Sequence, residues 1–76
     1  MDLLTMMKVF INVADKGSLA KAGKELNFSP SVMSKNISGL EDRLGARLLN
    51  RTTRSVSLTE VGQAYLDRAR RVIGDV

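Results

Sequence analysis

The chain has 76 residues, no cysteine and no histidine, and its 12 lysines and arginines outnumber its 8 acidic residues, giving a net charge of +4. A chain of this length forms one small domain. Without cysteine and histidine it lacks disulfides, the usual zinc ligands and the usual general base, so we expect neither a metal site nor a cofactor. A small basic domain indicates a polyanionic partner, most often nucleic acid. The apolar runs are too short to span a membrane and the N-terminus lacks a signal-peptide pattern, which predicts a cytoplasmic protein.

Helical spacing of apolar residues predicts three helices before residue 46. In the first helix, which is closed by Lys16 and Gly17, the apolar stripe comprises Leu3, Met7, Phe10, Ile11 and Ala14. Ser18 is a good N-cap for a second helix that stops at Asn27. The stripe of that helix comprises Leu19, Ala22, Gly23 and Leu26. Two short helices joined by a tight turn at Asn27 are typical of a helix-turn-helix, in which the small Gly23 allows a close crossing.

The third helix is predicted over residues 30–44. Ser29 and Pro30 suit its start, as N-cap and first helical residue, and Gly45 suits its end. Its apolar stripe comprises Met33, Ile37, Leu40 and Leu44. A β-hairpin is predicted next, with strands over 47–50 and 56–58, and then a helix that Thr59 caps and that runs to the end of the chain.

The outer face of the third helix carries short polar side chains and one cation: Ser31, Ser34, Lys35 and Ser38. Lys35 is the one charged residue between Glu25 and Glu41. Such a face suits a helix that enters the major groove of DNA, because small polar groups allow close approach and acids would repel the backbone. A merely solvated polar face is the alternative.

The segment from Arg43 to Thr59 holds four arginines and no acid. Arg51 and Arg54 bracket the predicted hairpin tip, where arginines can contact phosphates or enter a narrow minor groove. A loop that is basic by chance is the alternative. Because the polar helix face and the basic hairpin lie in consecutive elements, the pair is more specific than either alone.

Four runs of sequence resemble the LysR-type transcriptional regulators. They are SLAKAGKEL at 18–26, FSPSVMSKNI at 28–37, LEDRLGARLLNRTTR at 40–54 and LTEVG at 58–62. The resemblance implies a mainly α fold with a small β-hairpin. This is a winged helix-turn-helix over residues 1–59, with the helix-turn-helix at about 18–38 and the wing at about 47–58, followed by a truncated linker helix at 60–76.

For such a domain, the resemblance implies sequence-specific binding of double-stranded DNA by a bacterial regulator. The third helix would lie in the major groove and the wing arginines on the backbone and minor groove. The expected DNA-binding residues are Ser18, Pro30, Ser31, Ser34, Lys35, Ser38, Arg51, Thr52 and Arg54. Many members have Gln-Pro in place of Pro30-Ser31 and Arg in place of Lys35, so their base contacts are not carried over.

The last helix has an apolar stripe with two possible uses, namely covering the core or pairing two subunits. The residues expected to dimerise are Val61, Tyr65, Ala69, Val72 and Val76. Beyond about Arg68 we expect this helix to outrun so small a domain. Family members are several times longer and carry a C-terminal ligand-binding domain. The resemblance therefore implies an excised domain, whose full-length parent is a homodimer or tetramer that binds a small-molecule inducer through the missing part.

Two further classes of function stay open. Winged helices can also bind proteins, and fold alone does not fix function. Catalysis is disfavoured, because the chain offers few groups from which an active site could be built.

Overall fold

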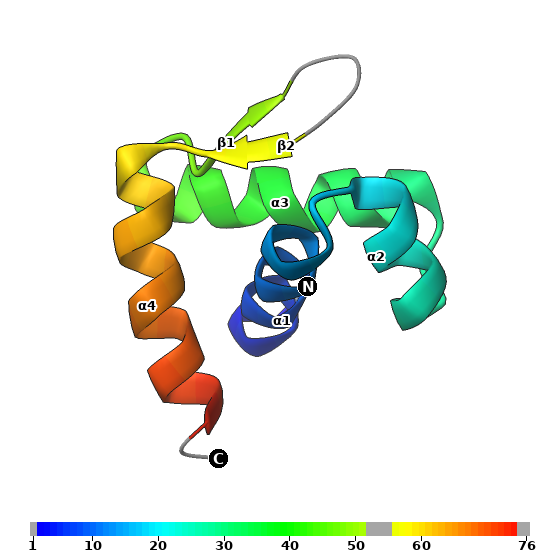
Figure 1. The fold of residues 1–76 in the computed structure, drawn as a ribbon, viewed down its shortest axis with the longest axis horizontal. Helices are drawn as coiled ribbons and strands as arrows, with labels where there is room; N and C mark the ends of the chain where they lie inside the picture. Colours follow the sequence, from blue (N-terminus) through cyan, green and yellow to red (C-terminus); the bar gives the residue numbers. More distant parts are fainter. Residues whose placement is uncertain (1, 52–55, 75–76) are drawn as a thin grey trace.

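The described part of this computed structural model comprises residues 2–51 and 56–74 and forms four helices and one hairpin (Figure 1). In chain order the elements are α1 (Leu3–Lys16), α2 (Leu19–Leu26), α3 (Pro30–Leu44), β1 (Leu49–Arg51), β2 (Val56–Leu58) and α4 (Glu60–Gly74). The predicted fold class and the order of its elements are confirmed.

Side-chain caps fix where the first three helices begin. The N-cap oxygens of Asp2, Ser18 and Ser29 each accept a hydrogen bond from the backbone N–H three residues later. All three helices end on a residue in the left-handed conformation, with φ of 69° at Gly17, 61° at Asn27 and 68° at Gly45. These are the boundaries that the cap residues predict, because such caps satisfy backbone groups that a helix leaves unpaired at its ends.

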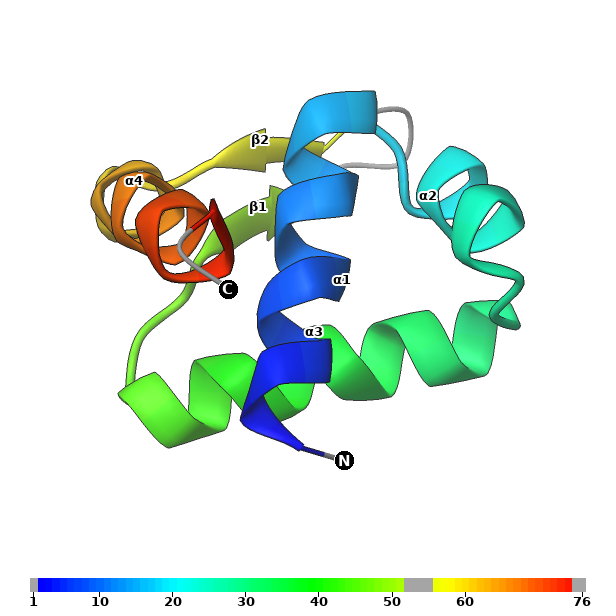
Figure 2. The same ribbon diagram turned by 90° about the horizontal axis from the view of Figure 1, so that it is seen from below.

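Helix α1 is the centre of the fold. It contacts α2, α3, α4 and β2, and Figure 2 shows it crossing α3 with α2 on one side and α4 on the other. Its buried residues are Met6, Met7, Val9, Phe10 and Val13. The predicted stripe was therefore wrong in part: Leu3 is exposed, and Met6, Val9 and Val13 were missed. The reason is that a helix with neighbours on several sides buries more than one stripe.

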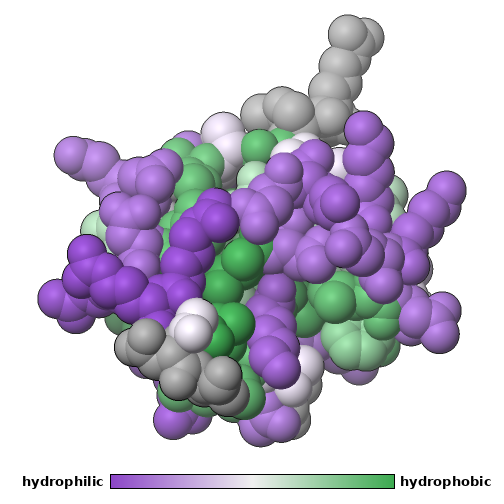
Figure 3. Space-filling model, turned by 60° about the horizontal axis from the view of Figure 1, so that its bottom comes forward, coloured by the Kyte–Doolittle hydropathy of each residue, from purple (hydrophilic) through white to green (hydrophobic). Residues whose placement is uncertain are grey.

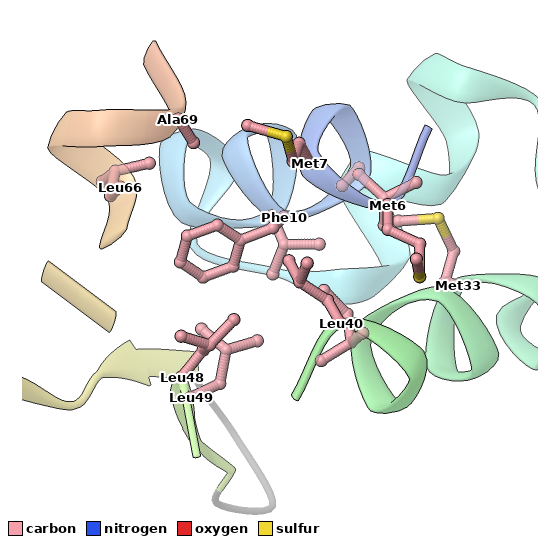
Figure 4. Close-up of a cluster of buried hydrophobic side chains, with 13 residues drawn as sticks. Met6, Met7, Phe10, Met33, Leu40, Leu48, Leu49, Leu66 and Ala69 are labelled. Atoms are coloured by element: carbon pink, nitrogen blue, oxygen red, sulfur yellow. The ribbon is translucent and has the colours of Figure 1, made fainter. Parts of the chain in front are cut away.

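The hydrophobic core lies where α1, α3, α4 and the hairpin meet (Figure 4). Met33, Ile37 and Leu40 of α3 are at most 1% exposed, whereas Leu44 is 40% exposed at the end of the helix, contrary to its predicted core position. On the face drawn in Figure 3, apolar surface appears as patches framed by hydrophilic side chains.

Helix α4 packs across α1 at a steep angle, as Figures 1 and 2 show. Leu66 and Ala69 are buried in the core, and Ile73 packs against it. Near the same end, the guanidinium of Arg70 donates a 2.6 Å hydrogen bond to the carboxylate of Asp15 in α1. The expectation that this helix outruns the domain beyond Arg68 is therefore wrong as far as Ile73, because Ala69 and Ile73 still pack on the core.

The hairpin is a two-stranded antiparallel sheet in which Leu49 pairs with Leu58 and Arg51 with Val56. Its first strand begins two residues later than the sequence predicts. Leu48 and Leu49 are buried and tie the base of the hairpin to the core. None of the helices within residues 2–51 and 56–74 has the length and apolarity needed to cross a bilayer.

Candidate nucleic-acid interface

The turn between α2 and α3 is tight and held by backbone hydrogen bonds. The N–H of Phe28 donates to the carbonyl of Gly23 at 2.9 Å, and the left-handed Asn27 donates to Gly23 and Lys24. A Cβ atom at Gly23 would lie 3.0 Å from the Phe28 carbonyl oxygen and 3.2 Å from Cγ of Met33. The predicted close crossing at Gly23 is thus present, and it fixes the angle between the two helices.

The first half of α3 has one buried side and one exposed side. Met33 and Ile37 lie in the core, while the exposed residues are Pro30, Ser31, Val32, Lys35 and Ser38. Ser34 is only half-exposed, because it borders α2. Four of the nine residues expected to contact DNA are thus exposed on α3, namely Pro30, Ser31, Lys35 and Ser38.

A groove of about 590 Å³ separates α2 from α3. Its floor is apolar, with Leu19, Gly23, Phe28 and Met33, and Pro30 and Ser34 also line it. Ser18 lies at the start of α2, half-buried, and its hydroxyl accepts a hydrogen bond from the N–H of Lys21. This serine therefore already has a structural role as helix cap.

A buried carboxylate joins α3 to the hairpin. Glu41 is 8% exposed, and its Oε2 accepts hydrogen bonds from the N–H groups of Leu48 at 2.9 Å and Leu49 at 3.4 Å. The sequence identified Glu41 only as the end of the acid-free half of the helix. Its role was missed because the partners lie seven and eight residues away, across a turn that no local pattern specifies.

A second junction fixes the hairpin to α4. The hydroxyl of Thr59 donates to the carbonyl of Arg47 at 2.6 Å and accepts from the N–H of Gly62 at 2.9 Å. The N–H of Thr59 donates to the carbonyl of Leu48 at 3.0 Å. The predicted N-cap at Thr59 is confirmed, and it also anchors the returning strand. Together with Glu41, it sets the position of the hairpin base relative to α3.

The basic residues of the hairpin are only partly within the described chain. Arg51 is the last residue of β1, and Arg43 and Arg47 are exposed near the hairpin base. The predicted contacts at Thr52 and Arg54 lie outside the described residues.

The stripe expected to pair two subunits is divided between two sides of α4. Val61 and Val72 are 50% and 48% exposed, while Tyr65 is half-buried with its ring 5.8 Å from that of Phe10. Ala69 is fully buried, so its predicted place in a subunit interface is corrected to the domain's own core. The core position of Leu66 was missed, and Val76 lies outside the described residues.

Three helices, a tight left-handed turn before the third and a hairpin fixed behind it define a winged helix-turn-helix domain. A family model described as the bacterial regulatory helix-turn-helix protein, lysR family, matches residues 4–63. The chain therefore belongs to the lysR family of bacterial regulatory proteins.

Solved structures with the same fold include DNA complexes of two regulators, CbnR and BenM. The complex of the CbnR DNA-binding domain with DNA is 38% identical at a TM-score of 0.92, covering 97% of this chain and 84% of that one. The complex of the BenM DNA-binding domain with catB DNA is 29% identical at a TM-score of 0.91, covering 99% and 83%. The likeness to these domains extends over nearly the whole chain.

The curated relatives include a transcriptional repressor and a transcriptional activator. A transcriptional repressor of Pseudomonas aeruginosa is 43% identical over 76 residues, covering 100% of this chain and 24% of the relative. The transcriptional activator AaeR of Escherichia coli is also 43% identical, covering 100% of this chain and 25% of the relative. This chain spans about a quarter of the length of these relatives.

Proposed function

We propose that this chain is the DNA-binding domain of a bacterial transcriptional regulator and binds a specific site in double-stranded DNA. The observation that carries the proposal is the first half of α3, where an exposed face of small polar groups and Lys35 lies opposite the buried Met33 and Ile37. Likeness to two DNA-bound domains over nearly the whole chain supports it. The proposal gives the chain no catalytic role, and it implies a cytoplasmic location, where bacterial DNA lies.

In this proposal α3 enters the major groove with its N-terminal half against the base edges. Ser31, Lys35 and Ser38 would face the bases or adjacent phosphates, with Pro30 and the half-exposed Ser34 at the edge of the contact. Ser18 would act through its helix, because the cap leaves N–H groups at the start of α2 for a phosphate.

The hairpin supplies the second contact. Arg51 and Arg54 would neutralise phosphates or enter the minor groove on one side of the α3 contact, and the Thr52 hydroxyl would donate a hydrogen bond to a phosphate. Glu41 and Thr59 support this role indirectly, because their hydrogen bonds fix the hairpin base relative to α3. We assign DNA binding to residues 1–59 and the start of a linker helix to residues 60–76. This division is one of function, because both parts contribute to the same hydrophobic core.

Pairing of the full-length parent, as a homodimer or tetramer, would use the part of α4 that the core leaves uncovered. Val61 and Val72 lie eleven residues apart, which at 100° per residue puts them within about 20° of each other. Both are exposed, so a second copy could bury them by two-fold symmetry. An inducer would act through the rest of the parent, and the direction of regulation is open, since relatives include a repressor and an activator.

Selection of bound duplexes from a random pool tests this proposal. We expect one enriched site, bound with a steep loss of affinity as salt rises, because neutralising phosphates releases counterions. A protein-interaction module would enrich no sequence and would bind duplexes, if at all, without preference. That outcome would contradict the proposed function.

A further inference from the structure

Val32 is an apolar side chain in an otherwise polar surface. It is the third residue of α3, it is 39% exposed, and it is absent from the side chains packed on the core. Leu44, the other exposed large apolar residue of α3, is 40% exposed but lies at the far end of the helix. The valine thus leaves apolar surface uncovered within the half of α3 proposed to meet DNA.

The backbone of Val32 is held at both of its polar groups. Its N–H donates to the Ser29 hydroxyl at 3.2 Å, and its carbonyl accepts from Nδ2 of Asn36 at 2.9 Å. Asn36 is itself only 1% exposed, so this amide is fixed by the core. In a helix, a β-branched side chain has one strongly preferred rotamer. The two methyl groups of Val32 are thus presented in a nearly fixed direction.

The neighbours of Val32 favour close approach to a flat ligand. Ser31 is short and exposed, and Lys35 lies one turn further on, at the i+3 position that shares a helix face. Base edges in the major groove offer mainly hydrogen-bonding groups, and the apolar exception is the 5-methyl group of thymine. The chemistry of an exposed valine on this face matches that methyl group.

We propose that Val32 is a specificity-determining residue that contacts the 5-methyl group of a thymine in the bound site. The inference rests on the proposed function, since it assigns a base preference to the same helix. Burial of the methyl group against the valine favours thymine over any base without an apolar group at that position. Lys35 would then place a positive charge beside the valine, and Val32 would discriminate thymine from the other bases.

The test uses the whole 76-residue chain and the duplex selected from the random pool. Each thymine in turn is replaced by deoxyuridine, which keeps the base pair and removes the methyl group. For the natural chain we expect roughly fourfold weaker binding at one thymine, the effect of one apolar group left unburied. Val32→Ala should bind thymine and deoxyuridine equally at that position. Leu4→Ala, which truncates a comparably exposed apolar side chain of α1, should keep the full preference for thymine.

Two results would overturn the inference while leaving the proposed function intact. One is a natural chain that is indifferent to deoxyuridine at every position yet still prefers its site over random duplex. The other is a Val32→Ala chain that keeps the full preference for thymine. If no duplex is enriched in the selection, the proposed function fails and this inference fails with it.

Discussion

The Glu41 carboxylate accepts a hydrogen bond from the backbone N–H of Leu48 at 2.9 Å, which joins the end of α3 to the base of the hairpin. Leu48 is itself fully buried, so without Glu41 its N–H would have no access to water. Leaving a buried donor unpaired costs about 1–3 kcal/mol. We therefore expect Glu41→Ala to lower the free energy of unfolding by that amount in urea titrations.

Two further variants distinguish the contribution of this hydrogen bond to stability from that of the negative charge at the end of α3. Glu41→Gln keeps an acceptor oxygen and should be less destabilising than Glu41→Ala. Asp42→Ala removes the neighbouring exposed acid and should change the stability by less than about 0.5 kcal/mol. Equal losses for Glu41→Ala and Asp42→Ala would show that the junction does not stabilise the fold.

Two glycines of α4 should respond in opposite directions to alanine. A Cβ atom on Gly62 would lie 2.9 Å from the carbonyl carbon of Leu48 and overlap the oxygen of that carbonyl, whereas one on Gly74 meets nothing within 4 Å. Overpacking against backbone costs about 1–3 kcal/mol, so Gly62→Ala should lower the melting temperature. Gly74→Ala should leave it unchanged or raise it, because alanine favours helix. A Gly62→Ala chain as stable as the Gly74→Ala chain would contradict the close approach of α4 to the hairpin base.

The helix-turn-helix turn depends on the left-handed conformation of Asn27. Its φ of 61° is strained for a residue with a plain Cβ atom but free for glycine. We expect Asn27→Ala to lower the free energy of unfolding by about 1 kcal/mol, while Asn27→Gly leaves it nearly unchanged. Chemical denaturation of the two variants measures this difference. Identical stabilities would mean that the turn does not require this conformation.

Burial raises the pKa of the Tyr65 hydroxyl above its ordinary value of 10.0, and the positive charge of Arg43 offsets part of that rise. The folded state thus holds this proton more tightly than the unfolded state. The resulting stabilisation is complete below about pH 10 and is lost as the pH rises through the folded pKa. Since the chain has one tyrosine and no tryptophan, its near-ultraviolet absorbance follows this group alone.

In folded chain the absorbance midpoint should lie above pH 10.0, and in urea it should return to about 10. Tyr65→Phe should reduce the loss of stability on the alkaline side. A midpoint that is the same in folded and unfolded chain would show that Tyr65 is solvated, contrary to its packing against Phe10.

Local signals in the sequence were sufficient for the element order. Ser18, Ser29 and Asn27 act through backbone groups a few residues away, so their roles as caps can be predicted from sequence. The periodic stripes were less reliable, because which face is buried depends on how many neighbours a helix has. Val9 in the central α1 was missed for that reason, and Ala69 was assigned to a subunit interface although it is fully buried in the core.

The junctions around the candidate site could not be predicted from sequence. Glu41 bonds to Leu48 across the end of a helix, and Gly62 lies against Leu48 only because α4 turns back at Thr59. These contacts depend on the tertiary path of the chain. The exposure of Ser31, Lys35 and Ser38 on α3 could be predicted, because 3.6-residue periodicity separates them from the core.

A duplex titration of Lys35→Ala tests whether the exposed N-terminal half of α3 reads DNA. The matched control is Lys8→Ala, an exposed lysine of α1. If Lys35 contacts a base edge, its loss should weaken binding to the selected site by about 1–3 kcal/mol and relax the preference at one position. Lys8→Ala should retain nearly all of the affinity and the whole preference. Unchanged affinity and preference in Lys35→Ala would contradict the proposed role of α3 in the major groove.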